Sequence, residues 1–151
     1  MFSRLYIDMC KQATEIQRNW RPNVGDFVAL GDDVSVIIYS FRRGDKVKYK
    51  LHLIRDREFD RDELIWLPTQ RQLQDILHSG KVVPVPCLEW QYIATEIWGH
   101  EKFFRDRDRT QYWRTFRTYE ELWLAYLMYE SYDKCWDEDK KEWVRGCRRL
   151  K

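Results

Sequence analysis

The stretch DFVALGDDVSVIIYSFRRGDKVKYKLHLI, from Asp26 to Ile54, decides the fold. It contains three runs of β-branched and aromatic residues, which are separated by Gly31-Asp32-Asp33 and by Arg42-Arg43-Gly44-Asp45. Such runs between glycine and aspartate turns predict a three-stranded antiparallel meander. In the third run two sets of residues alternate, which are Val47, Tyr49, Leu51 and Leu53 on one face and Lys48, Lys50 and His52 on the other. We therefore expect one face of the meander to be buried and the other to be solvated.

The residues before the meander have the period of a helix. Apolar side chains recur at alternating spacings of four and three, at Phe2, Tyr6, Met9, Ala13, Ile16 and Trp20. This spacing predicts one amphipathic helix, with Ser3 as its N-cap and Pro22 closing it.

Two capping boxes predict two helices after the meander. Thr69 and Gln72 precede a stripe made of Leu73, Ile76 and Leu77, with Gly80 beyond it. They predict a short helix near Gln70 to His78. Thr118 and Glu121 open the second helix, whose stripe is made of Tyr119, Leu122, Tyr126 and Tyr129, with Ala125 and Met128 beside it.

The remaining segments complete the prediction of the fold. The mixed charges of Arg55 to Glu63 suit an exposed connection, and Leu88 to Trp98 fits either a helix or a strand. Trp136 and Trp143 flank a charged turn, which suggests a small terminal hairpin. We predict one α+β domain over residues 1–151, with an N-terminal helix, a small antiparallel β-meander, two or three further helices and this hairpin.

Composition restricts the classes of partner. The 151 residues carry a formal net charge of only +2, so a role on nucleic acid needs a local basic patch. The longest uncharged apolar run, VSVIIY, is too short to span a bilayer, and we expect no membrane partner. The four cysteines have no CxxC spacing, and no signal peptide is evident, so we expect reduced thiols and a cytoplasmic protein.

Three motifs carry a family resemblance. NWRPNVGD, IWLPTQRQLQDIL, and EELWLAYLMYESYDKCW followed by EWV resemble a group of short, uncharacterised proteins encoded by phages and prophages of Gram-positive bacteria. The resemblance runs from about Trp20 to Val144. It implies a phage origin and the cytoplasm of a bacterial host, and it implies no reaction.

Motifs for catalysis or metal binding are weak. His52, His78 and His100 lack the spacing of a zinc site, and neither a GxSxG elbow nor a glycine-rich phosphate loop occurs. We therefore assign no catalytic, metal or cofactor-binding residue, and expect no cofactor. A small enzyme that acts on a nucleotide stays open as a second alternative.

The strongest candidate for binding is KFFRDRDRTQYWRTFR, from Lys102 to Arg117. Its arginines interleave with aromatic residues, a combination that pairs phosphates and stacks bases, and the candidates are Arg105, Arg107, Arg109, Trp113, Arg114 and Arg117. Asp106 and Asp108 lie between the arginines and would neutralise part of their charge. A second basic group consists of Arg42, Arg43, Lys46, Lys48 and Lys50. Solubility and the protection of strand edges explain that group most simply.

These observations favour a non-enzymatic phage or prophage accessory protein. We expect it to bind a host or phage macromolecule, such as a component of defence or DNA metabolism. Nucleic-acid binding through residues 102–117 is the first alternative. Trp123 lies off the stripe of its helix and, with Trp136 and Trp143, is a candidate partner surface. The oligomeric state is left open.

Overall fold

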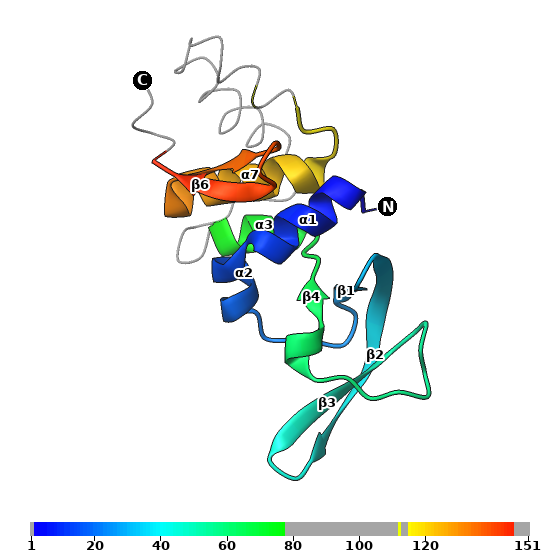
Figure 1. The fold of residues 1–151 in the computed structure, drawn as a ribbon. Helices are drawn as coiled ribbons and strands as arrows, with labels where there is room; N and C mark the ends of the chain where they lie inside the picture. Colours follow the sequence, from blue (N-terminus) through cyan, green and yellow to red (C-terminus); the bar gives the residue numbers. More distant parts are fainter. Residues whose placement is uncertain (1, 78–111, 113–114, 147–151) are drawn as a thin grey trace, which may run out of the picture. The chain divides into compact units, whose positions relative to one another are not determined.

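The computed structural model describes residues 2–77, 112 and 115–146. Figure 1 shows their helices and strands. Contacts divide the chain into two compact units. The first contains residues 1–69 and 136–143, and the second contains residues 70–135 and 144–151.

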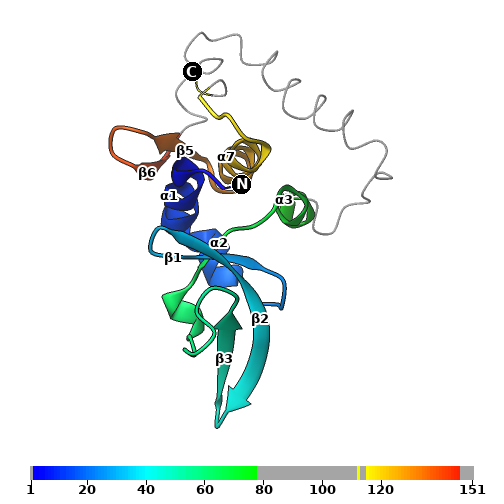
Figure 2. The ribbon, with the colours of Figure 1, turned by 90° about the vertical axis from the view of Figure 1, so that its right-hand side faces the viewer.

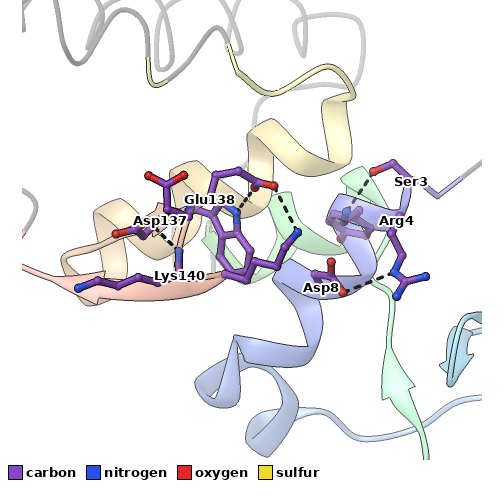
Figure 3. Close-up of polar contacts among 10 residues, drawn as sticks. Ser3, Arg4, Asp8, Asp137, Glu138 and Lys140 are labelled. Carbon is purple, nitrogen blue, oxygen red and sulfur yellow. Dashed lines mark hydrogen bonds and ion pairs between the residues drawn. The ribbon is translucent and has the colours of Figure 1, made fainter.

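The first unit begins with two short helices, α1 (Arg4–Gln12) and α2 (Thr14–Asn19). The backbone N–H of Tyr6 donates to the Ser3 hydroxyl at 3.0 Å, which confirms Ser3 as the N-cap, and Arg4 pairs with Asp8 one turn later (Figure 3). Most of the predicted stripe is buried, namely Tyr6, Met9, Ala13, Ile16 and Trp20. The prediction of one continuous helix is wrong, because the backbone leaves the helical region at Ala13, where φ is −82° and ψ is 71°.

The side chain of Gln17 explains how this break is tolerated. Its amide nitrogen donates to the carbonyl oxygen of Cys10 at 3.1 Å and to that of Trp66 at 3.0 Å. Its amide oxygen accepts from the N–H of Trp66 at 2.8 Å. Gln17 therefore binds a carbonyl at the end of α1 and also pairs with the backbone of Trp66 as a neighbouring strand would.

An antiparallel sheet of four strands follows, in the order β3-β2-β1-β4. Its strands are β1 (Phe27–Leu30), β2 (Asp33–Arg43), β3 (Lys46–Leu51) and β4 (Ile65–Trp66). The predicted meander is confirmed, with Gly31 and Gly44 at positive φ in its two turns, as a tight reversal requires. β4 was not predicted, because two residues are too few to show a period.

The predicted alternation of β3 holds only in its middle. Tyr49 and Leu51 are buried, whereas Val47 and Leu53 are 40% and 61% exposed. The connection that follows carries exposed charges, as expected, and contains the short helix η1 (Arg61–Glu63). It also buries Phe59, which forms an antiparallel bridge with Tyr49 at the outer edge of β3.

The predicted C-terminal hairpin is confirmed as β5 (Lys134–Asp137) and β6 (Glu142–Arg145). Its turn is held by the Asp137 carboxylate, which accepts from the N–H groups of Asp139 at 3.0 Å and Lys140 at 3.1 Å (Figure 3). The indoles of Trp136 and Trp143 pack edge to face, with their ring centroids 5.2 Å apart. The Trp143 indole also donates to the Met9 carbonyl oxygen, which attaches the hairpin to α1.

In the second unit, α3 (Gln70–Leu77) packs against α7 (Tyr119–Tyr132). Thr118 caps α7, since its hydroxyl accepts from the N–H of Glu121 at 3.2 Å and donates to the Glu121 carboxylate at 3.0 Å. Every residue from Trp123 to Tyr129 is buried. These elements confirm the predicted α+β class, while the prediction of one domain over residues 1–151 stays a prediction.

Candidate nucleic-acid interface

The hairpin of β2 and β3 extends past β1 as a two-stranded ribbon (Figures 1 and 2). β1 pairs with residues 33–36 of β2, and β3 pairs with residues 37–43. Gly25 and Asp26 exchange backbone hydrogen bonds with Ile37, which is where pairing on the β1 side stops. Among the described strands, β2 therefore pairs with β3 alone beyond Ile37, and the outer edge of β3 is bridged by Phe59 at Tyr49.

One face of this ribbon collects aromatic and basic side chains. Three cross-strand pairs form it, which are Tyr39 with Lys50, Phe41 with Lys48, and Arg43 with Lys46. Directly paired residues of antiparallel strands project from the same side of the ladder. We call these six residues the hairpin face. Arg42 pairs with Val47 and projects from the opposite side.

A β-bulge creates this arrangement. Ile37 pairs with Leu51, and both side chains are buried. Regular alternation would place Tyr39, two residues further along, on the same buried side as Ile37. The register shifts between Ile37 and Tyr39, so Ile38 is an extra residue that reverses the alternation. Tyr39 and Phe41 therefore project beside the lysines and not into the core.

The side chains of Tyr39, Phe41 and Arg43 form a column along β2. The two rings are stacked, with centroids 5.8 Å apart and an interplanar angle of 25°. The guanidinium carbon of Arg43 lies 5.7 Å from the centroid of Phe41. Glu58 fixes that guanidinium with two hydrogen bonds, of 3.1 and 2.5 Å. Tyr39, at the other end of the column, is 57% exposed.

The hairpin face keeps an excess of positive charge. Its four basic residues meet two carboxylates, because Arg43 pairs with Glu58 and Lys48 pairs with Asp60 at 2.5 Å. The hydrogen bond from Lys48 lowers the pKa of Asp60, and the charges of Lys48 and Lys46 add to this effect. Within the described part of the chain, neither Lys46 nor Lys50 has a carboxylate within ion-pair distance. Lys46 and Lys50 can thus contact a ligand without breaking an ion pair of the described residues.

The binding residues predicted from the sequence do not belong to the hairpin face. Arg105, Arg107, Arg109, Trp113 and Arg114 lie outside the described residues. Arg117 is exposed, and its backbone N–H donates to the Glu121 carboxylate at 3.2 Å, so the residue leads into the cap of α7.

The tryptophans predicted to face a partner are buried instead. Trp123 has an exposed fraction of 0%, because α7 is buried around its whole circumference and a position off the apolar stripe is still inside. Trp136 and Trp143 are 7% and 9% exposed and contact each other. None of the three offers a partner surface in this structure.

A hollow of about 260 Å³ lies at the end of α2. Its lining residues are Lys11, Thr14, Gln17, Arg18, Trp20, Arg61, Asp62, Leu64 and Ile65. The Arg61 guanidinium in this hollow donates to the carbonyl oxygens of Gln17, Arg18 and Trp20 at 2.5 to 3.0 Å. Arg61 therefore caps the C-terminus of α2, which explains its position without a ligand.

The cysteines differ in state. Cys10 is a free thiol, and burial raises its pKa above the usual range, so it is protonated at neutral pH. Cys135 is disulfide-bonded, so the expectation of reduced thiols is wrong for this residue. Among residues 2–77, 112 and 115–146, no group of three or more His, Cys, Asp or Glu side chains could hold a metal ion. The helices of this part are also too short or too polar to cross a membrane.

Comparison with known proteins identified no relative of this chain. No family model, no curated protein and no solved structure matches this chain. A proposal for its function therefore depends on the chemistry of its own surface, and within residues 2–77, 112 and 115–146 the hairpin face is the part that combines basic and aromatic side chains.

Proposed function

We propose that this protein is a phage or prophage accessory protein that binds nucleic acid through the hairpin face. The observation that supports binding is the gathering of four basic side chains and two aromatic rings on one side of a ribbon. The proposal of a phage origin depends on the sequence resemblance alone. Nucleic acid is the macromolecular partner that this combination of charge and aromatic surface fits best.

The lysines are placed to contact a phosphate backbone. Lys46, Lys48 and Lys50 alternate along β3, so their Cα atoms form a row about 13 Å long at the rise of a strand. Lysine provides a flexible point charge, which suits contact with phosphates without reading sequence. We therefore expect salt-dependent affinity with little sequence preference.

Neutralising the two lysines without ion pairs tests the proposal. The double variant Lys46→Gln with Lys50→Gln should weaken binding to a 20-nucleotide oligonucleotide roughly tenfold at about 50 mM salt, because two phosphate contacts are lost. Fluorescence anisotropy of the labelled oligonucleotide measures the affinity.

The matched control removes the same charge elsewhere. Lys11→Gln with Lys140→Gln changes two exposed lysines outside the ribbon and lowers the net charge equally. It should change the affinity less than twofold. Absence of binding by the unmodified protein at low salt, or equal weakening by both double variants, would refute the proposal.

A further inference from the structure

The aromatic column of the hairpin face ends in an exposed ring, Tyr39, on one side and in a guanidinium, Arg43, on the other. Phe41 lies between Tyr39 and Arg43, and the bidentate contact with Glu58 holds Arg43 in place. Tyr39 is therefore the aromatic end of the column, where a further planar group can stack on a ring. Tyr39 is 57% exposed to solvent, although an aromatic side chain contributes most to stability or binding when it is buried.

The column also holds Tyr39 ready for such a group. Its ring is stacked on Phe41, and the bulge at Ile38 directs it away from the core. A ring that is oriented before binding loses less conformational entropy when a ligand stacks on it. Stacking of a nucleobase on an aromatic side chain contributes about 1 to 3 kcal/mol per base.

Lys50 supplies a charge next to this exposed end. It is the direct cross-strand partner of Tyr39 and has no ion pair among the described residues. The Cβ atoms of such a pair are about 5 Å apart, so an ammonium group on a lysine stem can reach a phosphate attached to the stacked nucleotide. Tyr39 and Lys50 together provide an aromatic ring for the base and an ammonium group for the phosphate of one nucleotide.

We infer that the hairpin face selects single-stranded nucleic acid, with an unpaired base stacked on Tyr39 and the adjacent phosphate bound by Lys50. This inference depends on the proposed function, and it adds the class of nucleic acid. In a duplex the faces of the bases are covered by their neighbours, so Tyr39 has no base to stack on. A duplex keeps only the phosphate contacts of the lysines, and we expect it to bind more weakly.

Substitution of Tyr39 separates stacking from charge. Tyr39→Leu should weaken binding to a dT20 and to an rU20 oligonucleotide by about tenfold or more, because the aromatic face is lost. It should change the affinity for a 20-base-pair duplex by less than twofold. Tyr39→Phe keeps the ring and should retain the affinity for both single strands. Anisotropy titrations of the three labelled ligands measure these ratios, and circular dichroism verifies that each variant is folded.

The outcomes distinguish the inference from the proposed function. If Tyr39→Leu leaves the ratio of single-strand to duplex affinity unchanged while the Lys46→Gln, Lys50→Gln variant loses binding, selection by stacking is wrong and nucleic-acid binding stands. If the duplex binds as tightly as the single strands, the inference is also wrong. If none of the three ligands binds to the unmodified protein, both are refuted. Weakening by Tyr39→Leu for dT20 alone would restrict the ligand to single-stranded DNA and support the inference in that form.

Discussion

Gln17 connects parts of the first unit that are distant in the sequence. Three hydrogen bonds join its side-chain amide to the backbone of Cys10 and of Trp66, which is 49 positions away in the sequence. The Trp66 N–H lies at the end of a strand of only two residues, and so has few other ways to find an acceptor. An amide is the side chain that can donate to a carbonyl and accept from an N–H at the same time.

Removal of this amide should destabilise the protein. Gln17→Ala leaves the Trp66 N–H and two carbonyl oxygens without these bonds, and we expect a loss of about 2 kcal/mol in the free energy of unfolding. Urea denaturation followed by far-ultraviolet circular dichroism measures it. Gln12→Ala, at an exposed position of α1, is the matched control and should change the free energy by less than about 0.5 kcal/mol. Equal effects of the two substitutions would contradict the role of Gln17.

At the scale of elements, the N-cap of α7 is the local signal with the clearest energetic consequence. Thr118→Ala removes the acceptor of the Glu121 N–H and one donor to the Glu121 carboxylate, which is only 2% exposed. We expect a loss of about 1 kcal/mol, or a fall in Tm of about 2 to 4 °C. Thr118→Ser keeps the hydroxyl and should preserve most of the stability. Calorimetry of the two variants compares them, and a serine variant as unstable as the alanine variant would exclude the capping role.

Local signals in the sequence predicted the elements that depend on neighbouring residues. Ser3, Thr118 and the glycine turns at Gly31 and Gly44 act within a few positions, and the structure confirms each of them. The break at Ala13 was not predictable in this way, because Gln17 stabilises it through a contact with β4. β4 was also missed because it depends on a long-range contact, its pairing with β1, which local sequence signals do not show.

The candidate site was harder to predict than the fold, for two physical reasons. A period of two assigns Tyr39 and Phe41 to the side of buried Ile37, and only the extra residue at Ile38 moves them to the lysines of β3. The basic group itself was visible in the sequence, but its aromatic neighbours were not. The position of Trp123 off the apolar stripe of α7 suggested an exposed side chain, whereas it is buried, as is every residue from Trp123 to Tyr129.

At the scale of the whole molecule, charge is balanced overall and concentrated locally. The chain has 27 basic and 25 acidic residues, so its net charge produces little long-range attraction for a polyanion. Under the proposed function, affinity for nucleic acid must then come from the few cations that contact phosphates. The number of those contacts can be obtained from the slope of log K against log salt, because each contact releases counterions from the nucleic acid.

The salt dependence therefore distinguishes the hairpin face from the segment 102–117. With two to four phosphate contacts, the slope of log K against log salt for a single strand should be about −1.4 to −2.8, at about 0.7 per contact. Lys46→Gln with Lys50→Gln should reduce the slope by about 1.4 because it removes two contacts. A quadruple variant, with Arg105, Arg107, Arg109 and Arg114 each changed to Gln, should leave the slope unchanged if the hairpin face makes the contacts. The reverse pattern, with a flat slope only in the quadruple variant, would transfer nucleic-acid binding to residues 102–117 and refute the hairpin face as the interface.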